Sequence, residues 1–433
     1  MKIGAAQKII TPDSPHLLTQ TGMERQHPTQ GVLQDLFVEA LAFDNGDGNP
    51  AFVTTADLRT IERDWIFRIK DTLSQKLGCD PRRILLSSNH NHCSSPIPYY
   101  ETKAAHAAAK KAHEKIVNAL IDACLEAYEN RREARIAYGA ATLTEPIGQN
   151  RRMRLCSGIA VQAWGSGPFC PPGHKLAFPP GEDSTEIRFL AVKEPNAAKP
   201  FALLTAYPAH IHLAEIPFFA GEVAGAVKLE LKKRLGKNLI ALYASGAAGD
   251  VAVQIAHPQP AIPMQIDFKP HVAWFKKSQK LLARRFADAL LPALQEAKYR
   301  PAKTLRSAYY STGDDAARND IDAPHTILST LALGDILLAS IPGELFLNYQ
   351  TRLAQKSPNK KFLLLGYNGS ANGYVPEPIG FEHGGYETMR GPAAKGETRL
   401  QIRPHVYARR SARDLGDRIE AQLLKQFSAL SSQ

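Results

Sequence analysis

The chain has 433 residues, of which 44% are hydrophobic and 22% are charged, a composition typical of a globular protein with a large core. This composition excludes wholesale disorder, and the 30 glycines and 30 prolines follow no period that would indicate collagen or a coiled coil. Lysine and arginine outnumber aspartate and glutamate by 53 to 42, and the net charge of +11 favours anionic partners without predicting a fold.

Cysteine usage and hydropathy indicate a protein of a reducing compartment. The five cysteines are odd in number and share no C-x-x-C spacing, so no disulfide framework or zinc knot is expected. The first residues contain no apolar stretch before Thr11 and Pro12, unlike a signal peptide. The most apolar stretch, 328–347, is interrupted by Asp335, Pro342 and Glu344, so no transmembrane segment is expected. We therefore expect a cytoplasmic protein.

Short β-rich segments alternate with longer segments of helical periodicity. Predicted strands cover Phe37–Phe43, Ala51–Ala56, Arg83–Ser88, Arg135–Gly139, Glu186–Val192, Phe201–Ala206, Leu239–Ala244, Ser307–Ser311, Leu328–Leu333, Ile336–Ile341 and Lys361–Leu365. Predicted helices cover Thr60–Leu77, Thr102–Glu129, Gly221–Leu235, Val272–Glu296, Gly343–Gln355 and Tyr407–Phe427. Interleaved strands and helices predict an α/β protein with mixed β-sheets flanked by helices. No linker is visible, which favours one large domain over residues 1–433.

Histidine pairs follow two of the predicted strands. His90 and His92 come after Arg83–Ser88, and His210 and His212 come after Phe201–Ala206. Residues two apart in an extended chain point to the same side. His90 and His92 would therefore either bind one ion together, or one would bind the ion while the other contacts the substrate. Imidazole is a common zinc ligand. One such pair alone is more often a hydrogen-bonded loop. Two pairs at strand ends of an α/β sheet are harder to explain by chance, and for the second pair a metal ligand and a satisfied loop histidine are equally open.

Three further segments carry polar or small residues at element ends. Small residues at 244–250 would let the backbone approach a ligand, although a plain tight turn explains them equally. Glu344 is expected near a helix N-terminus, where the helix dipole would stabilise its negative charge. Tyr386 lies in a long glycine-rich loop, where a tyrosine usually serves packing. Loops of the length of 156–183 and 366–395 are usually functional or disordered.

Taken in order, these segments resemble the neutral/alkaline ceramidase family. The resemblance runs from Lys2 to Glu387 and rests on an ordered set of individually weak motifs. These motifs are Lys2–Pro12, Gly31–Phe37, Asp57, Ser88–His92, Asn150–Arg151, His210, Gly221–Gly225, Gly249–Val251, Pro342–Glu344, Asn372–Pro376 and Gly385–Glu387.

The resemblance implies a zinc-dependent amidohydrolase acting on a small-molecule or lipid-like acyl substrate. By position, the implied zinc ligands are His90, His210, Glu344 and Tyr386. The implied catalytic residues are His92 for proton transfer, Arg151 for holding the substrate carbonyl, and Asp250 for orienting the adjacent turn. The implied substrate-binding residues are Arg25, Arg152 and Tyr374, and Arg390 is a further candidate for an anionic group.

The sequence departs from the family at several points. Ala252 occupies the position of a family serine that is implicated in hydrolysis, which rules out a serine-dependent step there. The family's C-terminal β-sandwich domain has no counterpart in the chain, and the segment 156–183 looks peculiar to this protein. An amide, ester or lactone of a soluble acyl compound is therefore as plausible a substrate as a sphingolipid.

Two other functions remain open at this point. Ala252 is compatible with a degenerate family member that binds a ligand without turnover. The charge of +11 is compatible with nucleic-acid binding, but the basic runs 228–237 and 269–285 lie on predicted amphipathic helices and no nucleic-acid motif accompanies them. We therefore expect solvated helix faces there and no nucleic-acid partner.

Overall fold

The computed structural model describes residues 1–20, 28–155, 160–162, 176–178, 182–214, 216–253, 269–312, 326–370, 373–388 and 413–431. Within these ranges the side chains of 153–155, 160–162, 176–178 and 386 are not described. None of the helices in this part of the chain is both long enough and apolar enough to cross a membrane.

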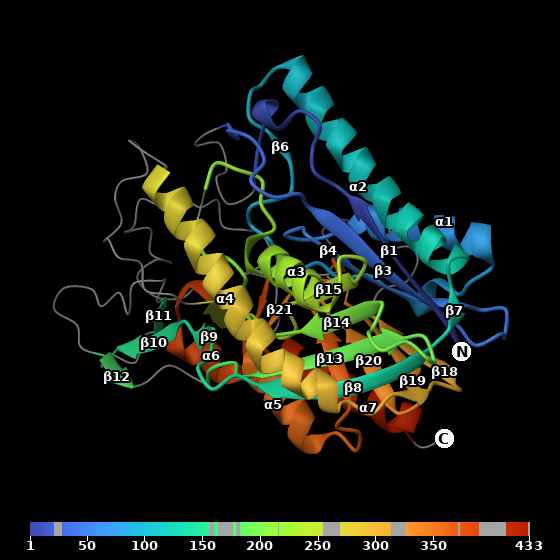
Figure 1. Cartoon of the computed structure of the whole chain (residues 1–433). Coiled ribbons are helices and arrows are strands. Elements are labelled where there is room, and N and C mark those ends of the chain that lie inside the picture. Colours follow the sequence, from blue (N-terminus) through green and yellow to red (C-terminus); the bar gives the residue numbers. More distant parts are fainter. Residues whose placement is uncertain are drawn as a thin grey trace.

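Three β-sheets form the interior, as the sequence predicted (Figure 1). The first sheet has the order β5 (Ile84–Leu85), β4 (Ala51–Ala56), β3 (Phe37–Asp44), β1 (Lys2–Ile9) and β7 (Arg132–Glu133). The second has the order β15 (Ile240–Ala244), β14 (Ala202–Ala206), β13 (Glu186–Lys193), β8 (Arg135–Thr142) and β17 (Arg300–Pro301). The third has the order β18 (Leu305–Ser311), β19 (Ile327–Leu333), β20 (Ile336–Ser340) and β22 (Phe362–Leu365).

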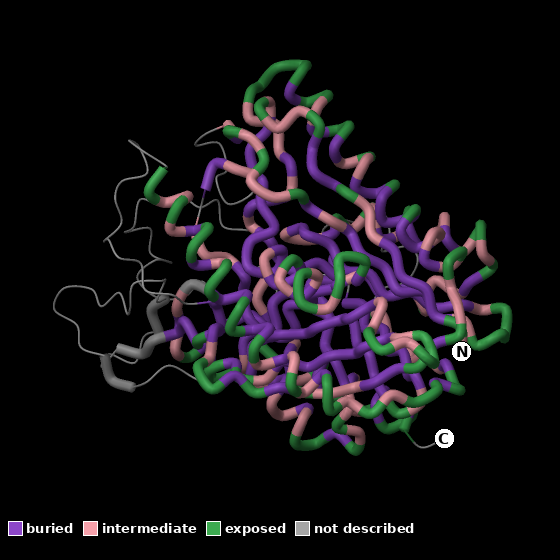
Figure 2. Tube along the Cα trace, viewed as in Figure 1, coloured by how far each residue is buried: buried purple, intermediate pink, exposed green. Residues whose placement is uncertain are grey.

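Each sheet is covered on one face by its own helices and shares one central core with the other two. Helices α1 (Arg63–Leu77) and α2 (Lys103–Glu129) cover the first sheet, and α3 (Glu222–Leu235) and α4 (Lys269–Glu296) cover the second. Helices α5 (Leu347–Lys356) and α7 (Leu415–Ser431) cover the third. Figure 2 shows the sheets as a continuous buried interior with the exposed residues on the outer sides of the helices. The predicted mixed α/β fold is confirmed.

Smaller elements connect these layers. They are β2 (Leu18–Thr19), β6 (Ile97–Pro98), β9 (Gly148–Asn150), β10 (Arg152–Leu155), β11 (Ala160–Gln162), β12 (Leu176–Phe178), β16 (Val251–Val253), β21 (Glu344–Leu345), β23 (Tyr374–Val375), α6 (Pro378–His383) and the 3-10 turns Pro15–Leu17, Pro81–Arg83 and Tyr386–Thr388.

Strand β3 shows that the first sheet is buried on both of its faces. Its residues Val38, Ala40 and Ala42 pack against α1 and α2, whereas Leu41 and Phe43 enter the central core. Successive side chains of a strand point to opposite faces, so a strand covered on both sides is apolar at most of its positions. The predicted apolar run therefore reflects a sheet buried on both faces.

Each of the three sheets contains one parallel strand pair among the described residues. The pairs are β4 with β5, β14 with β15, and β20 with β22. Serine side chains join the ends of these pairs across sheets. Ser87 Oγ donates to Gly366 O at 2.7 Å, Ser245 Oγ to Asn89 O at 2.8 Å, and Ser340 Oγ to Leu86 O at 3.0 Å. The carboxyl ends of strands from three sheets are thereby held together.

Two predicted elements have different bounds from those expected. The strand predicted over Arg83–Ser88 is reduced to Ile84–Leu85, because Ser88 keeps only an isolated bridge to Ala56 of β4 and the Ser87 side chain bonds to Gly366. The helix predicted from Gly343 begins only at Leu347, and Glu344 instead belongs to β21, which pairs with β23. The predicted start of the last helix at Tyr407 lies outside the described residues.

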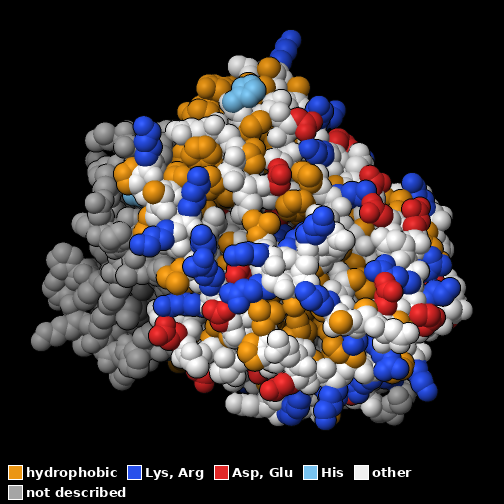
Figure 3. All heavy atoms as spheres, in the orientation of Figure 1, with side chains coloured by type: hydrophobic (Ala, Val, Ile, Leu, Met, Phe, Trp, Pro, Cys, Tyr) orange, Lys and Arg blue, Asp and Glu red, His pale blue; other side chains and the backbone are white. Residues whose placement is uncertain are grey.

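Basic side chains are spread over the face that carries α3 and α4, mixed with acidic and apolar groups (Figure 3). Arg234 pairs with Glu230 and Asp288, and Arg285 pairs with Glu145. This distribution is that of a solvated surface in which charges of both signs alternate.

A buried charge cluster ties α3 to the first sheet. Lys228 Nζ donates to Glu39 Oε1 and to both carboxylate oxygens of Asp57, each at 2.7 Å. Asp57 also accepts from Asn89 Nδ2 at 2.6 Å, immediately before His90. One cation faces two buried carboxylates, and burial raises the pKa of Glu39 to about 7. Near neutral pH, partial protonation of Glu39 therefore brings the net charge of the cluster closer to zero.

Replacing Lys228 by methionine should lower the free energy of unfolding by about 3 kcal/mol, because it leaves two buried carboxylates without their cation. Denaturant titration at pH 8 measures this loss. The matched control is Lys233→Met on the same helix, whose side chain is 70% exposed and whose loss should change stability by less than about 0.5 kcal/mol. Equal effects of the two substitutions would contradict the interpretation.

The protonation of Glu39 predicts a specific pH dependence. Its folded-state pKa of about 7 exceeds the ordinary value of 4.5, so between these values the folded protein holds a proton that the unfolded chain releases. This contribution to stability is present at low pH and is lost as the pH rises through 7. From pH 5 to pH 8 the wild type should lose about 2.5 kcal/mol relative to Glu39→Gln, which cannot ionise. Parallel stability curves for the two proteins would count against a shared proton.

Candidate metal centre

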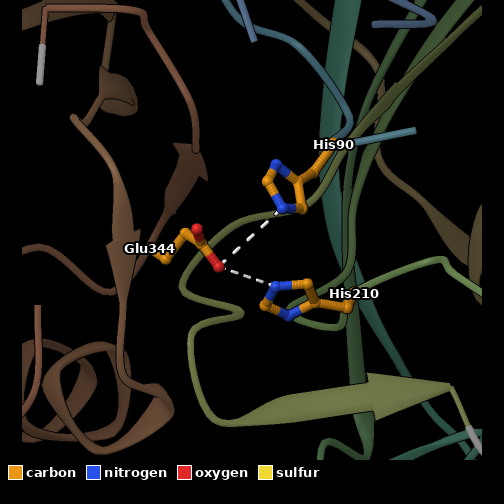
Figure 4. Close-up of side chains that lie close together, drawn as sticks. All are labelled: His90, His210 and Glu344. Carbon is orange, nitrogen blue, oxygen red and sulfur yellow. Dashed lines mark hydrogen bonds and ion pairs between the residues drawn. The ribbon is translucent and has the colours of Figure 1, made fainter. Parts of the chain in front are cut away.

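His90, His210 and Glu344 converge where the three sheets meet (Figure 4). Their candidate ligand atoms all lie within 4.8 Å of one another, and all three residues are buried. Glu344 Oε2 lies 2.8 Å from His210 Nε2 and 3.8 Å from His90 Nε2. His90 follows β5, His210 follows β14 and Glu344 follows β20, so each sheet contributes one residue to the cluster.

Backbone carbonyls fix the orientation of both imidazoles. His90 Nδ1 lies 2.8 Å from Arg59 O, and His210 Nδ1 lies 2.6 Å from Ala248 O and 3.0 Å from Val251 O. A carbonyl oxygen only accepts, so each Nδ1 carries a proton and each Nε2 is the atom left to face Glu344. A lone pair and a carboxylate at 2.8 Å repel each other unless a proton or a metal ion lies between them.

The electrostatic setting favours the protonation states that metal ligands need. Burial lowers the pKa of His90 to about 3, which keeps the ring neutral. Burial opposes ionisation of Glu344, but the two histidines and Arg151 outweigh it and lower the pKa of Glu344 to about 2. The expectation that a helix dipole stabilises Glu344 is wrong, because the residue lies in β21 before the helix. Side chains from other loops supply the stabilisation instead.

His92 does not belong to the group of candidate ligand atoms found among the described residues, and the backbone at His90 is not extended. His90 has a φ of 61°, in the left-handed region, and the two rings stand edge to face with centroids 4.9 Å apart. The His92 ring instead stacks on His212, with centroids 4.5 Å apart. Glu222 accepts from the His92 backbone N–H at 2.7 Å and bonds His212 Nδ1 at 3.0 Å. The result is a second histidine pair beside the first cluster.

Arg151 lies beside the cluster and is fully buried. Its Nε donates to Glu387 Oε1 at 3.1 Å and its Nη2 donates to Gly249 O at 2.9 Å. Arg152 donates to the other oxygen of Glu387 and to the carbonyls of Gly380 and Gly384. Glu387 therefore holds both guanidinium groups, with Arg151 nearer to Glu344.

Tyr374 and Asp250 occupy supporting positions. The Tyr374 ring lies 6.2 Å from the His210 ring and 5.4 Å from the Arg151 guanidinium carbon. Asp250 accepts from Asn150 Nδ2 and from the backbone N–H of Leu347, the first residue of α5. Gly249 must lack a side chain, because a Cβ there would lie 2.2 Å from Glu344 O. The turn at Gly249 and Asp250 thus packs directly against the backbone of Glu344.

Several residues expected at the site lie outside the described residues. They are Arg25, Arg390, Asn372, most of the segment 156–183 and the side chain of Tyr386. Their roles stay predictions, as do the catalytic roles of His92, Arg151 and Asp250 and the substrate-binding roles of Arg152 and Tyr374. Ala252 is buried and forms a β-bridge with His210.

Sequence reasoning missed two residues that contact the histidines. Tyr367 stacks its ring on His90, with centroids 4.1 Å apart and planes 15° apart. Glu222 joins His92 to His212 and has a φ of 48°. The only available signals were the long glycine-rich segment that contains Tyr367 and the motif Gly221–Gly225 that contains Glu222.

The comparisons with known proteins concern the fold. No protein-family model and no curated protein matches the sequence. Neutral ceramidase from Pseudomonas aeruginosa matches with a TM-score of 0.69 at 13% identity, over 99% of this chain and 74% of the other. A solved structure described as ceramidase complexed with C2 matches with a TM-score of 0.70 at 12% identity, over 99% of this chain and 75% of the other. The resemblance inferred from the sequence is confirmed at the level of the fold, and almost the whole chain has the fold of a neutral ceramidase.

Proposed function

We propose that the protein is a zinc-dependent hydrolase that cleaves an amide or ester bond of an N-acyl or acyl compound. The observation that carries the proposal is the pairing of His210 Nε2 with Glu344 Oε2 at 2.8 Å while His210 Nδ1 is committed to backbone carbonyls. A buried cation between these atoms would remove the repulsion. Two imidazoles and a carboxylate are the donor set that catalytic zinc takes in proteins, with a further position for water or substrate.

The geometry of the cluster fits such an ion. Two ligand atoms bound tetrahedrally at ~2.1 Å lie roughly 3.4 Å apart, close to the separations of Glu344 from both histidines. The bonds of the two Nδ1 atoms to carbonyls are the outer hydrogen bonds that usually orient metal-bound histidines. A phenol from Tyr386 remains the predicted fourth ligand. Bound here, zinc would lower the pKa of a water molecule towards ~7 and would polarise a carbonyl group.

The residues of the chain would divide the remaining tasks. Arg151, held by Glu387 and Gly249 O, would stabilise negative charge on the carbonyl oxygen. His92 would pass a proton to the leaving group, since its Nε2 is buried and has no hydrogen-bond partner among the described residues. Asp250 would keep the Gly249 turn against Glu344.

The substrate class follows from the fold match only in outline. Both matched structures are ceramidases, and ceramide is an N-acyl amide. We extend the acyl-amide chemistry to this chain and leave the acyl length and the amine open. The competing function is binding of an acyl ligand without turnover, which Ala252 motivates.

The wild-type protein should bind one zinc ion, and His210→Ala should weaken the affinity at least ~100-fold, because it removes one of three buried ligands. Competition with a chromophoric chelator measures both affinities. His106→Ala is the control, since this histidine lies on α2 with its side chain 56% exposed. A folded wild-type protein without measurable zinc affinity would rule out the proposed function.

Zinc-loaded protein should hydrolyse at least one member of a panel of N-acyl amides, acyl esters and lactones of graded chain length. His92→Gln should lower kcat about 100-fold, because it removes the proton donor to the leaving group. The stoichiometry of zinc should stay the same in this variant, as measured alongside turnover. Zinc binding without turnover on any member would favour the ligand-binding alternative.

A further inference from the structure

The hydroxyl group of Tyr367 is a buried polar group without a described use. The residue is 3% exposed, and Oη has no hydrogen-bond partner in the described part of the chain. A hydroxyl group buried in this way costs free energy, so such groups nearly always bond to something in the functioning protein. The location of Tyr367 beside the metal centre indicates what that partner is.

The ring is fixed against the candidate metal ligands. It stacks on His90 at 4.1 Å and stands edge to face with His210 at 6.3 Å, at an interplanar angle of 80°. Glu344 and Arg151 both act electrostatically on the phenol. Burial, the first cause, and Glu344 hold the pKa of Tyr367 well above its ordinary value. A phenol ordinarily has a pKa of ~10, so its hydroxyl group can donate a hydrogen bond at neutral pH.

The backbone of Tyr367 is held in a conformation that a bulky residue rarely adopts. Its φ is 57°, in the left-handed region, which costs about 1–3 kcal/mol for a residue other than glycine. The neighbouring atoms enforce it, because Ser88 N donates to Tyr367 O, Ser87 Oγ to Gly366 O, and Asn368 N to Ile341 O. Strain maintained by surrounding bonds is typical of residues that a site needs in one orientation.

A second buried tyrosine shows that a hydroxyl group without a hydrogen-bond partner is not by itself evidence for a role in a site. Tyr243 in β15 also has a buried Oη without a described partner, but its ring packs on Phe286 in the core between the second sheet and its helices. Tyr243 does not share the left-handed backbone that Tyr367 has. The combination of strain, stacking on a ligand and proximity to Arg151 and Glu344 is what distinguishes Tyr367.

We propose that Tyr367 Oη donates a hydrogen bond to the carbonyl oxygen of the substrate as that oxygen gains negative charge. The inference rests on the proposed hydrolase function and adds a catalytic residue to it. The phenol keeps its proton throughout, so it stabilises the charge together with Arg151 and takes no part in proton transfer. The ring contacts His90, and the hydroxyl group is the part that we assign to the reaction.

The test compares Tyr367→Phe with the wild type by three measurements on zinc-loaded protein. The substitution removes the hydroxyl and keeps the ring that stacks on His90. We expect zinc affinity to stay within about twofold, because the ring contact remains. We expect the dissociation constant for acetohydroxamate, an oxyanion probe, to rise about tenfold, because a hydrogen bond to a charged oxygen is lost. We expect kcat to fall by about the same factor while KM stays within about twofold.

Tyr243→Phe is the matched control, since it removes an equally buried hydroxyl away from the site and should leave all three measurements unchanged. Unchanged acetohydroxamate binding and kcat in Tyr367→Phe would overturn the inference and leave the hydrolase function intact. A loss of zinc affinity in Tyr367→Phe would assign the hydroxyl to the metal ion instead and would also overturn it. A wild-type protein that binds no zinc would remove the proposed function itself and the inference with it.

Discussion

The Nε2 atom of His210 and a carboxylate oxygen of Glu344 lie 2.8 Å apart in a region closed to water. With Nδ1 bonded to the carbonyls of Ala248 and Val251, the free lone pair of His210 points at a negative charge. Such a contact is unfavourable unless a proton or a metal ion lies between the two atoms, and burial makes the penalty larger than it would be at the surface.

That constraint explains the architecture around the site. Three sheets share one core, and each contributes the carboxyl end of a parallel strand pair. The side chains of Ser87, Ser245 and Ser340 bond residues at the strand ends of one sheet to residues of another sheet. The carboxyl ends of the three parallel strand pairs therefore cannot move apart independently. The Lys228 cluster adds a charged anchor through Asp57 and Asn89, directly beside His90. Packing and buried polar bonds together fix the position of the cluster.

The match to neutral ceramidase extends over nearly the whole chain at 13% identity, so the two chains share a fold while most of their side chains differ. Ala252 offers no hydroxyl group next to His210, whereas Tyr367 offers one next to His90. His212 and His92 form a second, half-buried pair of imidazoles held by Glu222. Under the proposed function, these side chains would shape the surroundings of the metal ion.

Local sequence determined most of the elements of the fold. The apolar runs at 37–43, 51–56 and 186–192 became strands within a residue or two, because a sheet buried on both faces requires continuous apolar residues. The motif order also indicated His90, His210 and Glu344 as a group. Only the tertiary structure decided that His92 turns to His212, that Glu344 lies in a strand, and that Tyr367 stacks on His90. Those outcomes depend on left-handed backbone at His90 and Tyr367, enforced by bonds between residues far apart in the chain, which no local pattern encodes.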